Sequence, residues 1–311
     1  MSKSKVLIIA LVVCLIILGA GAFLIFGNNI GLTYANADKY TAGETTVSGT
    51  VENLDVAWKS GNVRIEYHEG EGIRVTETGN RTISGDDRLR WWLDGATLRI
   101  QYAKSGRFVL IDTLDKTLTV SLPEGTELKK AKIHTTSGDL DIPKLTSEDT
   151  ELTVTSGNIN VLADTQRMTV SATSGDLNVR LAGDTDTVTI GVTSGRISAE
   201  LGNAKRATVS STSGDMQISG RIGEADISAT SGNISVRFDA FDRLSVKTTS
   251  GDVRAVLPET PGFTCTATVT SGKIETGIQM TKNGDTYVCG DGSKSCNIKT
   301  TSGNIRIDKA E

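Results

Sequence analysis

Serine is the reactive side chain that this 311-residue sequence repeats most regularly. It recurs in Thr-Ser-Gly triplets, whose serines and glycines are Ser137 and Gly138, Ser156 and Gly157, Ser174 and Gly175, Ser194 and Gly195, Ser213 and Gly214, Ser231 and Gly232, Ser250 and Gly251, Ser271 and Gly272, and Ser302 and Gly303. A nucleophilic serine needs one particular base and one orienting group beside it. Repetition is the opposite of such a unique site, so the pattern predicts a structural ladder of corners, no catalysis and no cofactor.

Aspartate is the second residue type with chemical potential. The residue after Ser-Gly in the first eight corners, from Ser137 to Ser271, is Asp139, Asn158, Asp176, Arg196, Asp215, Asn233, Asp252 and Lys273. Calcium-binding β-helices use nine-residue repeats with much denser glycine and aspartate, and interspersed Arg and Lys weaken a cation site. Acid alternates with non-acid instead, which is what stacked rungs require, because like charges directly opposite one another are destabilising.

The cysteines favour a structural role. Cys289 and Cys296 flank the turn-forming stretch Gly-Asp-Gly-Ser-Lys-Ser, so we expect them to close a hairpin with a disulfide. A rival pairing joins Cys265 to Cys296, because each stands six residues before a corner serine and would fill the same inward slot on adjacent rungs. Free thiols are the third alternative. The two histidines, His68 and His134, are too distant in sequence to suggest a zinc site with them, and no metal is predicted.

The three tryptophans mark a candidate binding patch. Trp58, Trp91 and Trp92 all fall in the irregular first part of the chain. An exposed aromatic cluster there would indicate a binding site, whereas burial of all three would favour a spacer without a ligand.

The spacing of the corners defines the architecture that holds these residues. Successive serines from Ser137 to Ser271 are 19, 18, 20, 19, 18, 19 and 21 residues apart. A short, regular period predicts a solenoid in which each unit stacks on its neighbours. The fold class expected is therefore all-β, a single-stranded β-solenoid with coils of about 19 residues.

Each coil shows two strands that share one interior. Around Ser194 the apolar residues are Val188, Ile190, Val192, Ile197, Ala199 and Leu201. Each flank alternates with period two, as in a strand with one buried face. The phase changes across Ser-Gly, so the chain must turn there, and glycine accepts the positive φ that such a corner needs.

The N-terminus predicts a membrane anchor. Residues 6–27 are uncharged and mostly apolar, long enough to cross a bilayer as a helix, and Lys3 and Lys5 precede them. We expect a cytoplasmic tail (residues 1–5), an anchor in the lipid bilayer (6–27), a spacer (28–45) and an extracytoplasmic solenoid (46–311). The competing interpretation is a cleaved signal peptide, because Ala20-Gly21-Ala22 has the small-x-small form.

The solenoid divides into irregular N-terminal coils (46–130), regular coils (131–271) and a C-terminal coil with a hairpin insertion (272–311). Ser60 begins an early corner 77 residues before Ser137, close to four periods, and Ser84-Gly85 and Ser105-Gly106 look like degenerate corners between them. Asn283-Gly284 and Gly290-Asp291-Gly292 are turn signals that predict the hairpin. The net charge of −4 comes without a basic block, which argues against a nucleic-acid partner.

The stretch from Thr117 to Gly125, running into Ile133–Leu140, and the serial Ser-Gly-Asp/Asn corners resemble the bacterial "putative adhesin" β-strand-repeat family of unknown function, which includes LiaG-like envelope proteins. The resemblance covers about residues 46–311. It implies a β-solenoid outside the membrane, often near envelope-stress regulators, and supplies no catalytic residues. A non-catalytic role in adhesion or envelope-stress sensing, with an envelope protein or polysaccharide as partner, is therefore expected. The alternative is a structural spacer, and a hydrolase of wall polymers is the least favoured.

Overall fold

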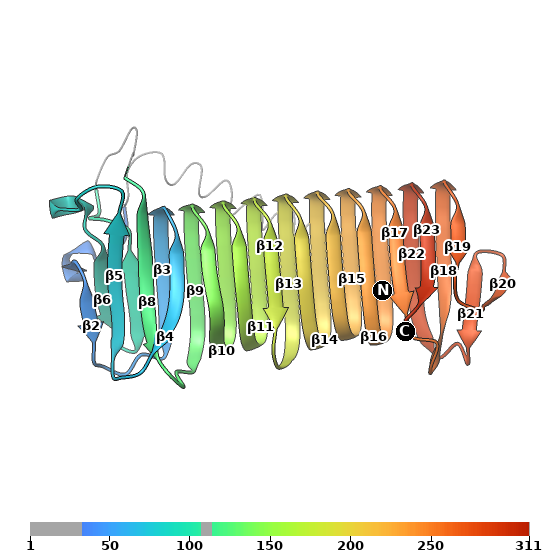
Figure 1. The fold of residues 1–311 in the computed structure, drawn as a ribbon, viewed down its shortest axis with the longest axis horizontal. Coiled ribbons are helices and arrows are strands. Elements are labelled where there is room, and N and C mark those ends of the chain that lie inside the picture. The colour runs from blue at the N-terminus through green and yellow to red at the C-terminus, as the bar shows by residue number, and fades with distance from the viewer. Residues whose placement is uncertain (1–32, 107–113, 311) are drawn as a thin grey trace.

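The chain forms a long, flattened stack of β-coils, in which two sheets face each other along the whole length (Figure 1). This computed structural model describes residues 33–106 and 114–310. The strand segments before each Ser-Gly corner form the leading sheet, and the segments after it form the trailing sheet. One hydrophobic cluster fills the space between the sheets from Val47 to Ile307. The expected all-β solenoid is confirmed.

The predicted anchor, residues 6–27, lies outside the described residues. Within the described part of the chain, no helix has the length and apolar character needed to cross a membrane.

The regular coils pair in parallel and in register. Five long strands run unbroken from the trailing sheet around the far bend into the leading sheet: β10 (Leu140–Ser156), β11 (Ile159–Ser174), β14 (Ile197–Ser213), β15 (Met216–Ser231) and β16 (Ile234–Ser250). The shorter strands β9 (Leu128–Ser137) and β13 (Asp184–Ser194) belong to the leading sheet alone, and β12 (Leu177–Leu181) and β17 (Val253–Leu257) belong to the trailing sheet alone. Serine pairs with serine on each neighbouring coil, as in Ser194 with Ser213. The alternating apolar residues therefore meet in columns inside the stack.

Glycine is required at the corners both by the positive φ and by the close approach of the neighbouring coil's backbone. Gly195 has a φ of +145°, and a Cβ placed on it would lie 2.0 Å from the carbonyl oxygen of Gly175 on the preceding coil. Its N–H donates to the carbonyl oxygen of Ser213 at 3.1 Å. Side chains rarely adopt such a φ, and the close backbone approach excludes even a methyl group.

The N-terminal part of the stack differs from the expectation of several intervening coils. β3 (Asn53–Ser60) and β4 (Val63–His68) stack directly on the first regular coil, with Ser60 the Cα partner of Ser137. The predicted corners at Ser84 and Ser105 do not join the column: Ser84 precedes the 3-10 helix η2 (Gly85–Asp87), and Ser105 lies outside the strands. The 77-residue interval is thus one rung with a long excursion.

That excursion, together with residues 37–47 before β3, builds a cap of shorter, mainly antiparallel strands. Beyond β3 the leading sheet continues with β7 (Thr97–Gln101), β6 (Arg90–Asp94) and β1 (Thr41–Ala42). Beyond β4 the trailing sheet continues with β8 (Lys116–Pro123), β5 (Ile73–Gly79) and β2 (Thr45–Val47), and the 3-10 helix η1 (Ala37–Lys39) precedes β1. Two- and three-residue outermost strands leave little free edge for another chain to pair with.

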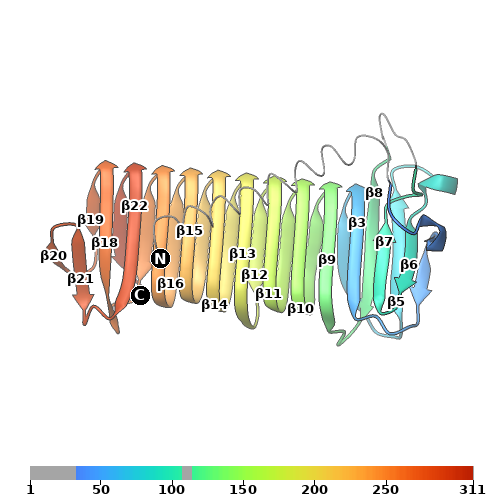
Figure 2. The same cartoon turned by 180° about the vertical axis from the view of Figure 1, so that it is seen from behind.

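The C-terminal coil is inserted between two coils that precede it in sequence. β22 (Lys294–Ser302) lies between β16 and β18 (Gly262–Ser271), and β23 (Ile305–Lys309) lies between β17 and β19 (Ile274–Thr276). Figure 2 shows β22 in this position from behind. The hairpin of β20 (Thr281–Asn283) and β21 (Thr286–Gly290) covers the outer edge of β18. The corner column therefore runs Gly251, Gly303, Gly272 in space, and Ser271 does not stack on Ser250.

Candidate functional site: the corner groove

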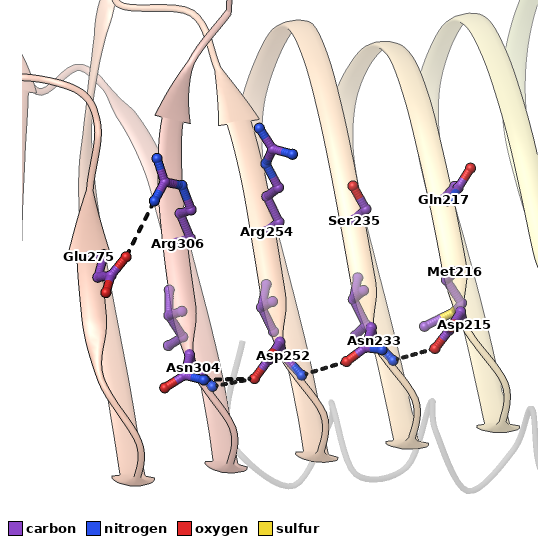
Figure 3. Close-up of a pocket in the computed structure, with 13 residues that line it drawn as sticks. Asp215, Met216, Gln217, Asn233, Ser235, Asp252, Arg254, Glu275, Asn304 and Arg306 are labelled. Atoms are coloured by element: carbon purple, nitrogen blue, oxygen red, sulfur yellow. Dashed lines mark hydrogen bonds and ion pairs between the residues drawn. The ribbon is translucent and has the colours of Figure 1, made fainter.

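A row of polar side chains follows the glycine column along one edge of the stack. In spatial order this row, the corner row, is Asn62, Asp139, Asn158, Asp176, Arg196, Asp215, Asn233, Asp252, Asn304 and Lys273. Each Asn or Asp accepts, through Oδ1, the backbone N–H of the same position on the next coil, at 2.7–3.0 Å. Figure 3 shows the run from Asp215 to Asn304.

The corner row explains the acid alternation more fully than repulsion does. Any Asn or Asp satisfies the N–H of the following rung, but only Asn can also donate to a neighbouring carboxylate. Asn158 Nδ2 lies 3.2 Å from Asp139 Oδ1, and Asn304 Nδ2 lies 3.2 Å from Asp252 Oδ1. With Asn304 inserted between Asp252 and Lys273, no two acids are neighbours in the row, although its last two members are both non-acidic.

A second polar row runs beside the corner row, two residues further along each coil. Its members on the trailing sheet are Arg64, Asp141, Asn160, Asn178, Ser198, Gln217, Ser235, Arg254, Arg306 and Glu275. Since the residue between the two rows points into the core, the rows border a shallow channel, which we call the corner groove. Hollows of about 400 Å³ and 410 Å³ lie in it, one near Arg254 and one near Arg64.

The C-terminal hollow carries two exposed guanidinium groups on adjacent coils. Arg254 and Arg306 stand on neighbouring coils with side chains 62% and 53% exposed, and both donate to Asp308. The hydrogen bond from Arg306 lowers the pKa of the Asp308 carboxyl, with burial acting in the opposite direction. Arg306 also pairs with Glu275 at 3.3 Å. The hollow thus offers fixed amide and carboxylate oxygens beside guanidinium N–H groups, a surface suited to hydrogen-bonding a polar partner.

The corner residues predicted from sequence form one column, with the Ser302 corner inserted between those of Ser250 and Ser271. The corner glycines line up in one column, and the corner serines from Ser137 to Ser302 are exposed. The hydrogen-bonded ladder, however, runs through the residue after glycine rather than through serine hydroxyls. The second row of the groove was not predicted, although the repeat has a polar residue four positions after each corner serine.

The predicted tryptophan patch does not exist as one surface. Trp58 is 1% exposed, and its Nε1 donates to the Lys116 carbonyl oxygen at 3.0 Å inside the stack. Trp91 and Trp92 are half-buried on β6, where Trp92 packs against Tyr40 with ring centroids 5.6 Å apart. Lys39 Nζ lies 5.0 Å from the Trp92 ring. Inward and outward alternation separates the three rings, so they serve mainly to fill and cover the cap.

A buried lysine holds this cap together. Lys116 is fully buried, and its Nζ lies 2.8 Å from Glu77 Oε2, 4.8 Å from the Trp58 ring and 4.1 Å from the Tyr102 ring. It also donates to the carbonyl oxygens of Asp87 and Tyr102. Sequence contained a signal for it, because Lys116 shares the inward phase of Leu118, Val120 and Leu122. Since a buried charge must be paired and hydrogen-bonded, we interpret the cluster as structural.

The structure places the cysteines differently from the favoured prediction of a Cys289–Cys296 disulfide. Cys265 and Cys296 are Cα partners on β18 and β22, with sulfur atoms 2.8 Å apart. Cys289 lies on β21, on the opposite side of β18. Cys289 and Cys296 are therefore two strand spacings apart, about 9.6 Å, which is too far for a disulfide. The expected Cys289–Cys296 bridge is wrong because β18 separates the two strands.

The histidines lie apart from one another. His68 ends β4, with Nε2 3.0 Å from the Gly72 carbonyl oxygen, whereas His134 lies on the outer face of β9. Within residues 33–106 and 114–310, no three His, Cys, Asp or Glu side chains are grouped as metal ligands.

Several solved structures are similar to this chain, each at 14% sequence identity. One described as a putative lipid binding protein from Parabacteroides distasonis has a TM-score of 0.47, covering 88% of this chain and 97% of its own. A putative adhesin from Parabacteroides merdae has a TM-score of 0.46 with the same coverages, and one from Bacteroides fragilis has 0.42, covering 86% of this chain and 97% of its own. Among curated proteins, none matches this chain.

A single family model covers the regular coils, the corner column and most of the N-terminal cap. The Toastrack DUF4097 model matches residues 51–308, and the chain therefore belongs to the Toastrack DUF4097 family.

Proposed function

We propose that this protein is a non-catalytic, membrane-anchored, extracytoplasmic β-solenoid that binds an extended envelope partner along the corner groove, in adhesion or in envelope-stress sensing. The observation that carries the proposal is the groove itself, which repeats the same polar geometry coil after coil. Adjacent coils are about 4.8 Å apart, so a partner that presents regularly spaced hydroxyl or amide groups would meet equivalent donors and acceptors at each step.

The placement outside the cell rests on the uncharged run at residues 6–27 and the lysines before it.

A non-catalytic role is supported by the chemistry of the groove. Its side chains repeat from coil to coil and are engaged with one another, as in the corner row and in the pairing of Arg306 with Asp308. Catalysis would require a unique constellation of base and nucleophile.

The test is binding of the purified full-length chain to peptidoglycan sacculi by co-sedimentation, and to extracted envelope proteins by pull-down. The groove variant is Arg254→Ser with Arg306→Ser. Its matched control is Lys247→Ser with Lys299→Ser, which removes the same charge from the same two coils on the leading sheet. We expect the groove variant to lose most of the binding and the control to retain it. Equal loss in both would mean that charge alone drives association, and it would overturn the groove as the site.

A structural spacer is the second candidate, and the burial of Trp58 favours it. An aromatic anchor is a common centre of a binding surface, and this tryptophan is used for internal packing instead. Absence of binding to both sacculi and envelope proteins would favour this candidate.

A further inference from the structure

We propose that Cys265 and Cys296 are oxidised to a disulfide that fastens the inserted C-terminal coil to the coil it stacks on. The two residues are paired in register on adjacent parallel strands, β18 and β22, with their sulfur atoms 2.8 Å apart. Neighbouring strands lie about 4.8 Å apart, within the Cα separation that disulfides span. Both side chains are buried, at 0% and 3% exposure.

Cys289, the third described cysteine, lies too far from Cys265 and from Cys296 to form a disulfide with either. Cys289 pairs with Phe263 across the β18–β21 ladder, so its relation to Cys265 is diagonal, at about 7–8 Å. From Cys296 it is separated by the full width of β18. Only the pair Cys265 and Cys296 is therefore within bonding reach among the described cysteines.

The position of the pair means that the bond would hold the inserted coil in its place in the stack. β22 inserts between β16 and β18, although it follows both of them in sequence. An inserted coil that is held by strand pairing alone opens locally more readily than one that is also cross-linked. A covalent link to β18 would prevent this coil from leaving its slot and would keep β16 and β18 apart, although their matching repeat would otherwise let them pair.

The chemistry is thiol–disulfide exchange with a small-molecule or protein disulfide as the oxidant. One cysteine thiolate attacks that disulfide, forming a mixed disulfide and releasing a thiolate. The second cysteine thiolate then attacks the protein sulfur of the mixed disulfide, which forms the Cys265–Cys296 bond and releases a second thiolate. The protein loses two protons and two electrons, and the oxidant becomes two thiols. Burial, and next the hydrogen bond with Cys265, raises the pKa of the Cys296 thiol, so the exchange takes place before this part of the core closes.

The test is mass spectrometry of the full-length chain refolded in a buffer of reduced glutathione and glutathione disulfide. The protein is unfolded in an alkylating reagent without reductant and then digested. We expect the fragments containing Cys265 and Cys296 to be joined and two hydrogen masses lighter than their sum, while Cys289 carries the alkyl group. Alkylation of both Cys265 and Cys296, or a link from Cys289 to Cys296, would overturn the proposal.

Three variants separate the bond from packing effects. Cys289→Ser is the matched control and should retain both the linked fragments and the fall in thermal midpoint when dithiothreitol is added. Cys265→Ser and Cys296→Ser should each lose that fall and expose the partner cysteine to alkylation. If these two variants do not fold, the fragments of the wild-type chain still decide the question. The outcome is independent of the groove, because no groove residue is altered.

Discussion

Asn304 donates its backbone N–H to Asp252 Oδ1 at 2.7 Å, although 52 residues separate the two in sequence. The contact places the last corner of the chain against the corner of the Ser250 coil. Asn304 in turn accepts the N–H of Lys273 at 3.0 Å. Lys273 stands on the outermost coil, where its side chain, which has no acceptor, has no further corner N–H to meet. A charged residue at this edge also discourages pairing with another chain.

Arg196 is the one interruption inside the corner row, and replacing it should stabilise the protein. Its N–H is bonded to Asp176 Oδ1, but its side chain offers no acceptor to Asp215 on the next coil. Arg196→Asn supplies that acceptor and should raise the free energy of unfolding by about 0.5–1.5 kcal/mol. Urea denaturation measures the change. Arg196→Ala is the control, since it removes the charge without adding an oxygen. If both variants gain equally, the ladder does not contribute.

The corner glycines should tolerate alanine far less well than glycines in open turns. In Gly195→Ala the new Cβ meets the Gly175 carbonyl oxygen at 2.0 Å, at a φ of +145°. The combined strain and overpacking should lower the free energy of unfolding by about 3 kcal/mol or more. Gly125→Ala is the matched comparison: its φ is +78°, but no atom lies within 4 Å of the added carbon. That change should cost about 1–2 kcal/mol. Similar losses in chemical denaturation would contradict the close approach between coils.

The buried ion pair in the cap should make Lys116 sensitive to neutral replacement. Lys116→Met leaves the Glu77 carboxylate buried without its cation, which should cost about 3–5 kcal/mol of unfolding free energy. Adding Glu77→Gln should recover a large part of this loss, because the amide oxygen can still accept the N–H of Leu89 while the uncompensated charge is gone. A double-mutant cycle by denaturant unfolding measures the coupling. A double variant no more stable than Lys116→Met would show that the charge of Glu77 is not the cause.

His134 should make stability fall on the acid side of neutrality. Burial, followed by the nearby charge of Lys132, lowers its pKa from 6.5, while Glu151 acts in the opposite direction. The unfolded chain binds this proton more readily than the folded chain, so stability decreases as the pH falls from about 6.5 toward the lower folded pKa. His134→Gln should remove that part of the slope. Thermal or urea unfolding between about pH 7.5 and 5 measures the difference. Parallel slopes in both proteins would refute the assignment, and His68→Gln serves as the comparison.

Which side chains of each coil face the interior was predictable from sequence, because it depends only on local alternation along the strand. Residues that alternate along a strand face opposite sides, so Val188, Ile190 and Val192 had to share one interior. The corner glycines followed from the change of phase across Ser-Gly. The alternation of acids in the corner row indicated stacking for the same reason: it depends only on which residues occupy one position of the repeat.

The order of the coils was decided by tertiary structure alone. Every regular coil presents the same backbone edge and a similar apolar column, so sequence period cannot tell which coil lies next to which. Asn304 lies between Asp252 and Lys273, and Ser60 lies directly beside Ser137, because long excursions return the chain to a free edge. The same holds for the contacts of Lys116, whose partners Glu77, Asp87 and Tyr102 come from separate segments, and for Cys265 and Cys296. Local alternation specifies which residues each coil can bury. Which coil pairs with which of the equivalent strand edges depends on the packing of the whole stack.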